Sequence, residues 1–430
     1  MKKFIKTTFL LILPALTLFW GCQKENDNTV NAIVNVTLPS DFPATAKFNG
    51  SVEIISTTTS KTYTAVAVNG VASFDKVLPD IYNIYVNKTL SLDEFKTIAP
   101  ALAGSAGIVM NGSSKSFKVI KTSGVENPTA TVNLDWCVQS NLLISKLYWN
   151  GSKYNKGTNE SLCKSMEIFN NTDQTIYLDG LCIGFVHGNT TAANPCALYT
   201  TYKDATYCSQ IARFDGTNGV TKNIPLEKGK SVVVALIAKN YIVTTDGDTK
   251  YTMAQDLSKA DFEVYSTATW FVDNPNVTNI NPVYSANPAS GLASLNPAFV
   301  LFYATQADID SWETGVDESS YTVASQKAWK AKRVPNSIIL DAIEAYKKDS
   351  NKQKRIPDVI NSQGIDGLNN EGTIFDRKIL YITDDGRIVL KDTNNSAKDF
   401  VEIQSRDRAN YSGAHLILKD YTKTEIQPSN

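Results

Sequence analysis

The sequence has very little histidine: His187 and His415 are the only two in 430 residues. A Ser-His-Asp or Cys-His arrangement needs a base that titrates near neutral pH, so at most two such sites could exist. The motifs G-x-S-x-G, H-E-x-x-H and G-x-x-x-x-G-K-[ST] are also absent. A glycosidase needs only paired carboxylates, so that class stays open, although nothing resembles a glycosidase signature. The sequence therefore predicts a protein that is not an enzyme.

Neither sign of charge predominates, since 42 Lys and Arg residues nearly balance 43 Asp and Glu residues. A balanced chain has no net field that would attract nucleic acid or anionic lipid, so we expect no nucleic-acid partner. No apolar run after the N-terminal one approaches the length that spans a membrane. Tyr (19 residues), Thr, Asn and Ser are abundant, which suits β-rich domains with polar loops at a cell surface.

Strong metal and cofactor motifs are missing too. The spacing C-x-x-C does not occur, so zinc or thioredoxin chemistry is not indicated. Residues 246–248 (DGD) and 384–386 (DDG) could offer oxygens to calcium, but both lie between β-like runs, where Asp and Gly are ordinary turn residues. Haem binding through His187 or His415 would rest on two isolated histidines. We expect no metal and no cofactor.

The N-terminus is the most informative segment that is present. Several lysines precede an apolar run from Phe9 to Trp20, which is too short for a membrane span and fits a signal peptide. Gly21 and Cys22 follow directly, and the stretch resembles a bacterial lipobox, which is cut before a diacylated cysteine. Phe19 and Trp20 depart from the usual residues of that motif. The alternative is an ordinary secreted protein in which Cys22 lies near the cut by chance.

The residues after Cys22 suggest a destination. Gln23–Asp27 (QKEND) resembles the short acidic export signal of Bacteroidota lipoproteins, which implies the outer face of the outer membrane. We therefore expect a lipid-anchored, outer-membrane protein exposed at the cell surface, with a signal peptide at 1–21 and a lipidated tether at 22–31. Two or three acyl chains hold a soluble domain firmly on a membrane.

Residues 32–138 show the pattern of short strands. Apolar residues alternate with polar ones in NAIVNVTL, SVEIIS and IYNIYVN. Asn69-Gly70 lies between two such runs and predicts a two-residue hairpin turn, because both central residues of a type I′ turn need a positive φ. The order G-x-V-x-I, hairpin, A-x-F and LPDIYNIYV resembles the prealbumin-like sandwich of carboxypeptidase regulatory domains, which serve as spacers and docking platforms.

Residues 139–430 resemble a lamin-tail domain, an immunoglobulin-like sandwich. The resemblance rests on Glu167–Asn170, a turn at 171–174 and the strand Ile176–Gly180, with IPLEKGKSVVVALI, NPAFVLFYA and the run from 376 to 400 as later strands. Long insertions separate these pieces. The chain is thus expected to be mainly β: a prealbumin/Ig-like sandwich followed by a lamin-tail-like sandwich with insertions and one amphipathic helix.

That helix is expected in VPNSIILDAIEAYKKDS. Pro335 and Asn336 give a start signal, and Lys347-Lys348 suit the negative end of the helix dipole. The apolar residues form a stripe at helical spacing: Ile338, Ile339, Ala342, Ile343, Ala345 and Tyr346. Packing on the sandwich is preferred to a partner-binding role.

Five cysteines remain once Cys22 is lipidated, and an odd number leaves one unpaired. Cys196 and Cys208 bracket a short loop and are expected to form a disulfide. If Thr172-Asp173 is a two-residue turn, Cys163 lies opposite Cys182, near disulfide range. A bulge at Gly180 would shift this register and leave Cys137 as the partner.

Aromatic residues in the insertions are the predicted binding surface. Loops that are rich in Tyr and Asn and held by a rigid sandwich are typical contact surfaces. The alternative is that the rings pack the insertions onto the core. The residues are Tyr199, Tyr202, Tyr207, Trp270, Phe271 and Tyr284.

The whole chain resembles a Bacteroidota lipoprotein family catalogued as domain of unknown function 4876. The resemblance rests on the lipobox, the prealbumin-like module and the segments MEIFNNTDQTIYLDGL, IILDAIEAY and LKDTNNSAKDF. It implies residence beside an outer-membrane transporter, often a TonB-dependent receptor, and carries no catalytic residues. We therefore expect a non-enzymatic surface lipoprotein that binds a ligand or accompanies such a transporter. The alternative is a structural or adhesive protein that binds matrix or glycan.

Overall fold

The computed structural model describes residues 28–102, 107–121, 127–138, 140–149, 152–153, 159–160, 162–188, 198–199, 203–241, 255–285, 297–316, 330–347, 352–368, 372–383 and 386–404. Within these ranges, no helix has both the length and the apolar character needed to cross a membrane. Cys22 and the signal peptide lie outside the described residues, as do Cys196, Tyr202, His415 and the DGD segment.

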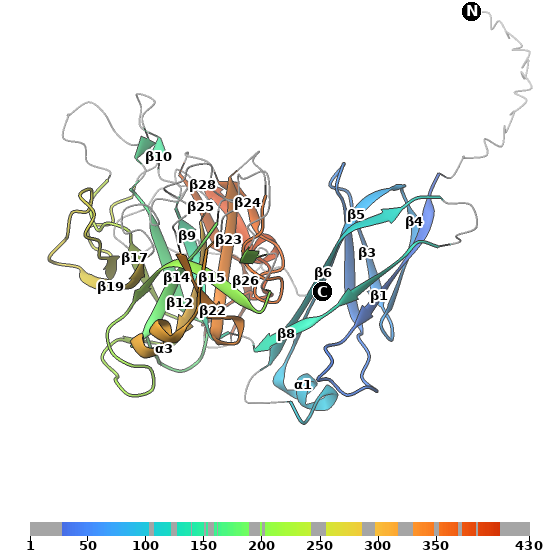
Figure 1. Ribbon diagram of the computed structural model, residues 1–430, viewed down its shortest axis with the longest axis horizontal. Helices are drawn as coiled ribbons and strands as arrows, with labels where there is room; N and C mark the ends of the chain where they lie inside the picture. Colours follow the sequence, from blue (N-terminus) through green and yellow to red (C-terminus); the bar gives the residue numbers. More distant parts are fainter. Residues whose placement is uncertain are drawn as a thin grey trace, which may run out of the picture.

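Residues 30–138 form a β-sandwich, drawn in blue and teal in Figure 1. A three-stranded sheet (β4-β1-β7) faces a five-stranded sheet (β3-β2-β5-β6-β8). The elements are β1 (Val30–Thr37), β2 (Gly50–Ser56), β3 (Thr62–Ala67), β4 (Val71–Val77), β5 (Asp80–Leu90), α1 (Leu92–Ile98), β6 (Ile108–Val119), β7 (Thr129–Asn133) and β8 (Asp135–Val138).

Period-2 alternation positions this core, as the sequence predicts. Along β1, Val30, Ala32, Val34 and Val36 are buried, while the residues between them are partly or fully exposed. They pack with apolar residues of β2, β5 and β6 in one cluster between the two sheets. Every second side chain along the strand is therefore buried, and those between face the solvent. This is the pattern of a sheet that is covered on one side only.

The Asn69-Gly70 turn is confirmed, with a difference in what it connects. Both residues have positive φ, 52° and 85°, and Val68 and Val71 exchange two backbone hydrogen bonds across the turn. However, β3 pairs with β2, and β4 pairs with β1. The turn therefore carries the chain from one sheet of the sandwich to the other.

Most strands of the remaining chain belong to one large sheet, with the order β24-β23-β20-β14-β15-β19-β18-β17-β12-β9-β25-β28 and with β21 and β22 attached beside β15. Their bounds are β9 (Leu142–Tyr148), β12 (Ser165–Asn170), β14 (Leu181–Val186), β15 (Ala205–Arg213), β17 (Ser231–Ala235), β18 (Phe262–Val264), β19 (Thr278–Ser285), β20 (Ala298–Tyr303), β21 (Thr314–Val316), β22 (Lys330–Pro335), β23 (Ile339–Lys347), β24 (Ile365–Leu368), β25 (Thr373–Arg377) and β28 (Phe400–Gln404). The shorter elements are β10 (Ser152–Lys153), β11 (Asn159–Glu160), β13 (Ile176–Tyr177), β16 (Pro225–Leu226), α3 (Gln306–Ser311), a 3₁₀ helix (Asn336–Ile338), β26 (Ile379–Ile382), β27 (Ile388–Leu390) and α4 (Ser396–Asp399).

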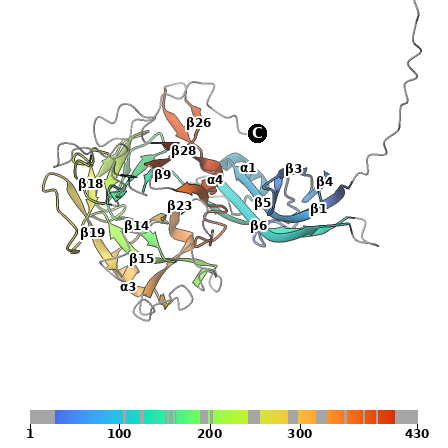
Figure 2. The ribbon, with the colours of Figure 1, turned by 90° about the horizontal axis from the view of Figure 1, so that it is seen from above.

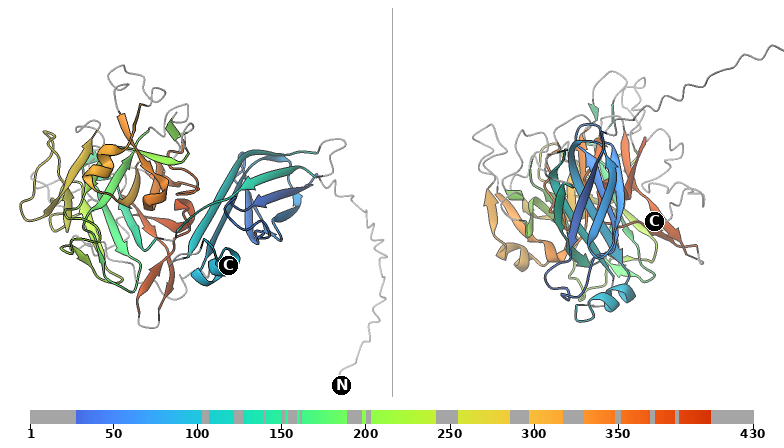
Figure 3. Two further views of the ribbon diagram at one scale, coloured as in Figure 1. Left: turned by 60° about the horizontal axis from the view of Figure 1, so that its bottom comes forward. Right: turned by 90° about the vertical axis from the view of Figure 1, so that its right-hand side faces the viewer.

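This sheet bends so that its two halves face each other (Figures 2 and 3). One apolar cluster joins Ile144 and Ile168 of the β9–β12 half to Ile183, Leu301 and Ile343 of the β14–β20–β23 half. The protein is thus mainly β, as the sequence predicts. The bent sheet buries apolar residues between its halves in the way that two packed sheets do.

The amphipathic-helix prediction is wrong, because residues 339–347 form strand β23. It pairs antiparallel with β20 and parallel with β24. Ile343 belongs to the cluster between the sheet halves, and Ala342 packs in a second cluster on the other side of the strand. A strand covered on both faces needs apolar residues in nearly every position, and a short run of that kind matches a helical stripe equally well.

The register behind the Cys163–Cys182 disulfide is also wrong. Strand β12 pairs with β9 and β17, whereas β14 pairs with β15 and β20, so the two segments form no hairpin. Cys182 and Cys208 are buried free thiols, and burial raises the pKa of Cys182 to about 12. Cys163 packs in a different cluster, with Tyr148. The predicted Cys163–Cys182 disulfide is therefore absent, and Cys196, the expected partner of Cys208, lies outside the described residues.

The two domains lie side by side and touch through a small polar interface (Figure 1). Strands β2, β5 and β6 of the first domain contact α4 and the residues near 358 and 393 of the second. The contacts are Lys398 Nζ to Glu53 Oε2 at 3.0 Å, Asn111 Nδ2 to the Val359 carbonyl at 3.4 Å, Asn87 to the Thr393 carbonyl, and Ser113 to Asp358.

Candidate functional site

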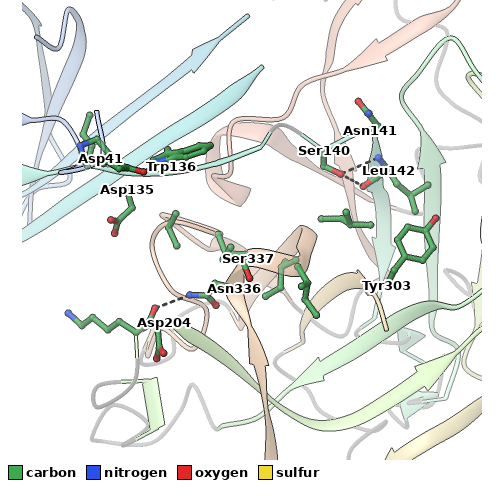
Figure 4. Close-up of a pocket in the computed structure, with 18 of the residues that line it drawn as sticks. Asp41, Asp135, Trp136, Ser140, Asn141, Leu142, Asp204, Tyr303, Asn336 and Ser337 are labelled. Atoms are coloured by element: carbon green, nitrogen blue, oxygen red, sulfur yellow. Dashed lines mark hydrogen bonds between the residues drawn. The ribbon is translucent and has the colours of Figure 1, made fainter. Parts of the chain in front are cut away.

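A cleft of about 1510 Å³ lies between the two domains, beside this interface. The first domain contributes residues 37–41, from the end of β1 onward, and 133–136, from the end of β7 into β8. The second domain contributes residues around the start of β9, β13, the turn at 218–222, the end of β20, and residues 336–340 before and within β23. Figure 4 shows Asp41, Asp135 and Trp136 on one side of this space and Leu142 and Tyr303 on the opposite side.

Trp136 forms a fixed part of the first-domain wall. Its indole Nε1–H donates to Asp41 Oδ2 at 2.9 Å, and its ring packs edge-on against Phe42 and tilted against Phe95. Aromatic contacts of this geometry stabilise a ring beyond its buried area. The ring and the Asp41 carboxylate therefore keep one arrangement at the mouth of the cleft.

The side chain of Asp135, the neighbour of Trp136, makes no hydrogen bond or ion pair with any residue that the structure describes. Partial burial, followed by the charges of Asp358 and Asp41, raises the pKa of its carboxyl group. Asp358 is already paired with Lys354 at 3.4 Å, whereas Asp41 and Asp135 both line the cleft, where a cation beside them would relieve their repulsion. This end of the cleft is therefore suited to a positively charged group.

A tight turn at 215–224 forms part of the second-domain wall, and Asp179 holds it in place. The carboxylate accepts hydrogen bonds from Thr221 Oγ1 at 2.6 Å and from the backbone N–H groups of Asn223 and Ile224 at 3.0 and 2.9 Å. Burial alone would raise the pKa of Asp179, but these donors outweigh it and lower the pKa. Asp179, which ends the predicted strand Ile176–Gly180 together with its glycine, thus has a structural role. The turn that it holds contributes Lys222 to the lining of the cleft.

Tyr177 and Tyr303 lie beside this turn. The Tyr303 hydroxyl donates to the Tyr177 carbonyl at 2.7 Å, and burial, with Asp179 nearby, raises the pKa of Tyr303 to about 12. The Lys222 ammonium group lies 5.5 Å from the centre of the Tyr177 ring. A cation over an aromatic face is modestly stabilised while it stays accessible to an anion.

The floor between these two ends is mostly aliphatic. Ile338 and Leu340 are partly buried and line the cleft, where the chain enters β23. Asn336 fixes this segment: its Nδ2 donates to the Lys203 carbonyl at 2.9 Å, and its Oδ1 accepts from Thr206 Oγ1 at 3.1 Å. The cleft therefore joins an end with Asp41, Asp135 and the neighbours Lys203 and Asp204 to a tyrosine-lined end with Lys222, across an apolar floor. Within the described ranges, no group of three or more His, Cys, Asp or Glu residues could hold a metal ion.

Those predicted binding aromatics that the structure describes do not line this cleft, and they lie in different parts of the second domain. Tyr207 is buried on β15, and Tyr199 packs against it. Burial, with the nearby charge of Asp358, raises the pKa of Tyr199. For these two residues the structure supports the alternative interpretation, in which the rings pack an insertion onto the core.

Trp270 and Phe271 lie elsewhere, partly buried against the large core. Phe271 stacks edge-on against Tyr265 at 5.4 Å between ring centres. Tyr265 and Tyr284 line a second, smaller cavity of about 200 Å³. Of the residues named from the sequence, Tyr284 therefore lines a cavity and Phe271 packs on Tyr265 of its wall, while the larger cleft is built from residues that were not singled out as a binding surface.

The sequence offered one signal for the cleft. Trp136 is the last residue of the alternating run TVNLDW and lies two positions before the predicted end of the first domain, so the sequence shows an aromatic residue near a domain boundary. The opposite wall comes from three distant parts of the chain, near 177, 218 and 338. Only the tertiary fold brings these together, and no local pattern encodes it.

Comparisons with known proteins agree with the family resemblance over part of the chain. Residues 227–406 match the family model described as "Protein of unknown function (DUF4876)". A crystal structure of a DUF4876 family protein from Bacteroides thetaiotaomicron VPI-5482 is similar, with 19% sequence identity and a TM-score of 0.49 over 86% of this chain and 94% of that chain. No curated protein matched the chain.

Proposed function

We propose that this protein is a non-enzymatic binding protein that is anchored by lipid at Cys22 on the surface of the outer membrane. It takes an elongated ligand into the cleft between its two domains and passes it to a TonB-dependent-type transporter. The observation that carries this proposal is the cleft itself. Pockets between domains that combine an apolar lining with a few polar groups are the usual place for a ligand.

The size of the cleft favours an elongated ligand. Its volume of about 1510 Å³ exceeds the roughly 300–1,000 Å³ that small-molecule pockets usually have. The two walls belong to different domains that meet through few contacts, so a ligand would bridge them. The anchor and the surface location come from the N-terminal motif, which supports a role in capture outside the membrane.

Site-specific photo-crosslinking in intact cells tests the proposal. A benzophenone amino acid replaces Ser337, which is exposed and lines the cleft, or Val66, which is 68% exposed on β3 and distant from it. We expect ultraviolet adducts to a ligand or an outer-membrane transporter from position 337 and not from position 66. Equal labelling from both positions, or labelling of matrix glycan alone, would favour the adhesive alternative.

The anchor has its own test. Cys22→Ser removes the acylated thiol, so the protein should lose labelling by a palmitate analogue and keep its uncleaved signal peptide. A variant that still takes up the palmitate label would contradict the lipoprotein assignment. Protease treatment of intact cells would then report exposure: complete protection would place the protein in the periplasm.

A further inference from the structure

We propose that the cleft binds short peptides with free termini in one direction, with the N-terminal ammonium group at Asp135 and the C-terminal carboxylate at Lys222. This inference rests on the proposed function, because it names the ligand class of the same cleft. It follows from what lies at each end of the cleft and from what lies between.

The acidic end has a carboxylate that lacks a partner. Asp41 accepts the Trp136 N–H, and Asp204 is paired with Arg333 at 2.6 Å. The Asp135 side chain has no such partner within the described chain, and burial, followed by the charges of Asp358 and Asp41, raises the pKa of its carboxyl group. An ammonium group at this position would pair with Asp135 and relieve the repulsion.

The opposite end of the cleft has an ammonium group that also lacks an ion-pair partner among the described residues. Lys222 is exposed, lines the cleft and makes no ion pair with any described residue. Its ammonium nitrogen lies 5.5 Å from the centre of the Tyr177 ring, and the Tyr177 carbonyl is already occupied by the Tyr303 hydroxyl. Three N–H donors of Lys222 therefore remain for a carboxylate.

The space between the ends suits a peptide chain. Ile338 and Leu340 offer an apolar floor to side chains of the ligand, and Asn141 and Asn218, both exposed in the lining, offer side-chain amides to its peptide groups. A neutral oligosaccharide has no charged ends for Asp135 and Lys222. A fatty acid or other single-headed lipid could satisfy only one of them.

Native mass spectrometry of the full-length protein with peptide pools tests the inference. The probes are pools of short random peptides with both termini free, with an acetylated N-terminus, or with an amidated C-terminus. Random pools remove the need to know which side chains the floor prefers. The cleft variants are Asp135→Asn and Lys222→Gln, and the matched controls are Asp75→Asn and Lys118→Gln, which change exposed charges of the first domain outside the cleft.

We expect the free pool to bind best and each blocked pool to bind about two- to fivefold more weakly, the range for an exposed ion pair. Asp135→Asn should weaken the free pool and leave the acetylated pool unchanged. Lys222→Gln should weaken the free pool and leave the amidated pool unchanged. The two controls should behave as the wild type does with every pool.

Two results would overturn the inference. Equal binding of all three pools would show that the termini are not recognised, and losses that do not follow the matching terminus would show that the direction is wrong. If no peptide binds while position 337 still crosslinks to a ligand in cells, the peptide inference fails and the proposed function stands. If position 337 crosslinks to nothing and no peptide binds, both fail.

Discussion

At the scale of single residues, Lys164 is the least expected feature of the second domain. Its side chain is fully buried, its Nζ has no hydrogen-bond partner in the described chain, and its nearest compensation is the Trp149 ring at 5.6 Å. Burial lowers the pKa of Lys164 to about 7 from an ordinary 10.5. The unfolded chain therefore binds this proton more tightly than the folded chain does.

Because the unfolded state holds the extra proton between about pH 7 and about pH 10.5, Lys164 should make the free energy of unfolding rise with pH across that window. Lys164→Met should remove this slope and stabilise the protein near neutral pH by at least about 1 kcal/mol. Chemical denaturation at several pH values measures both. Lys239→Met, an exposed lysine that also lies over a ring, is the control and should leave the slope unchanged.

A second buried charge predicts a slope of opposite sign. Arg377 lies among three carboxylates, with Asp341 at 2.6 Å and Asp392 at 3.5 Å. Burial, with the charge of Asp341 next, raises the pKa of Asp392 from 3.8 to about 7. The folded state then holds the extra proton, so this group's contribution to stability is lost as pH rises from about 4 to about 7.

Asp392→Asn should therefore stabilise the protein at neutral pH by at least about 1 kcal/mol and flatten the acidic part of the profile. Thermal unfolding on both sides of the window tests this. Asp366→Asn changes an exposed carboxylate and should have little effect at either pH. A loss of stability in Asp392→Asn at neutral pH would contradict this prediction, because it would mean that Arg377 needs the negative charge of Asp392 in addition to those of the other carboxylates.

At the scale of elements, the Asn69-Gly70 turn shows what local sequence can specify. Gly70 has φ of 85°, and a Cβ there would lie 2.8 Å from the Val36 carbonyl oxygen. Gly386 has nearly the same φ, 83°, but a Cβ there would meet nothing within 4 Å. Both glycines carry the left-handed conformation, and only one of them also makes a close approach.

Gly70→Ala and Gly386→Ala should each cost about 1–2 kcal/mol for the left-handed conformation. Gly70→Ala should lose about 1 kcal/mol or more beyond that, because it must also displace the Val36 strand. Equilibrium unfolding of the two variants measures the difference. Equal losses of unfolding free energy in the two variants would show that the β1 backbone moves aside without an energetic penalty.

Local sequence patterns predict a strand well when only one of its faces is covered, as in β1. They predict a strand poorly when both of its faces are covered, as in β23. In β23, Ile339 and Ala342 face one cluster, and Ile343 and Ala345 face another. The two acidic residues of the segment, Asp341 and Glu344, are buried beside Arg377 and Arg355, partners 36 and 11 positions away that no local period reveals. The same limit applies to β12 and β14, which look like a hairpin but have other partners.

At the scale of the molecule, the sequence indicated two β domains but not the space between them. The cleft exists because four polar contacts set one domain against the other, and each contact joins residues at least two hundred positions apart. Asn111 is the most buried of these residues, 1% exposed, and it bridges Asn87 to the Val359 carbonyl. If the cleft binds its ligand across both walls, then Asn111, which does not line the cleft, must influence the ligand affinity without touching the ligand.

Asn111→Ala should therefore loosen the domain arrangement while each domain stays folded, since a buried hydrogen bond contributes only about 1 kcal/mol. Small-angle scattering should show a broader distribution of dimensions than in the wild type, and the affinity for free peptides should fall for all side-chain compositions alike. Asn83→Ala is the matched control, because Asn83 bonds to Ser116 within the first domain. Unchanged scattering with reduced affinity would mean that Asn111 acts on the cleft locally, whereas changed scattering with unchanged affinity would show that one wall suffices to bind the ligand.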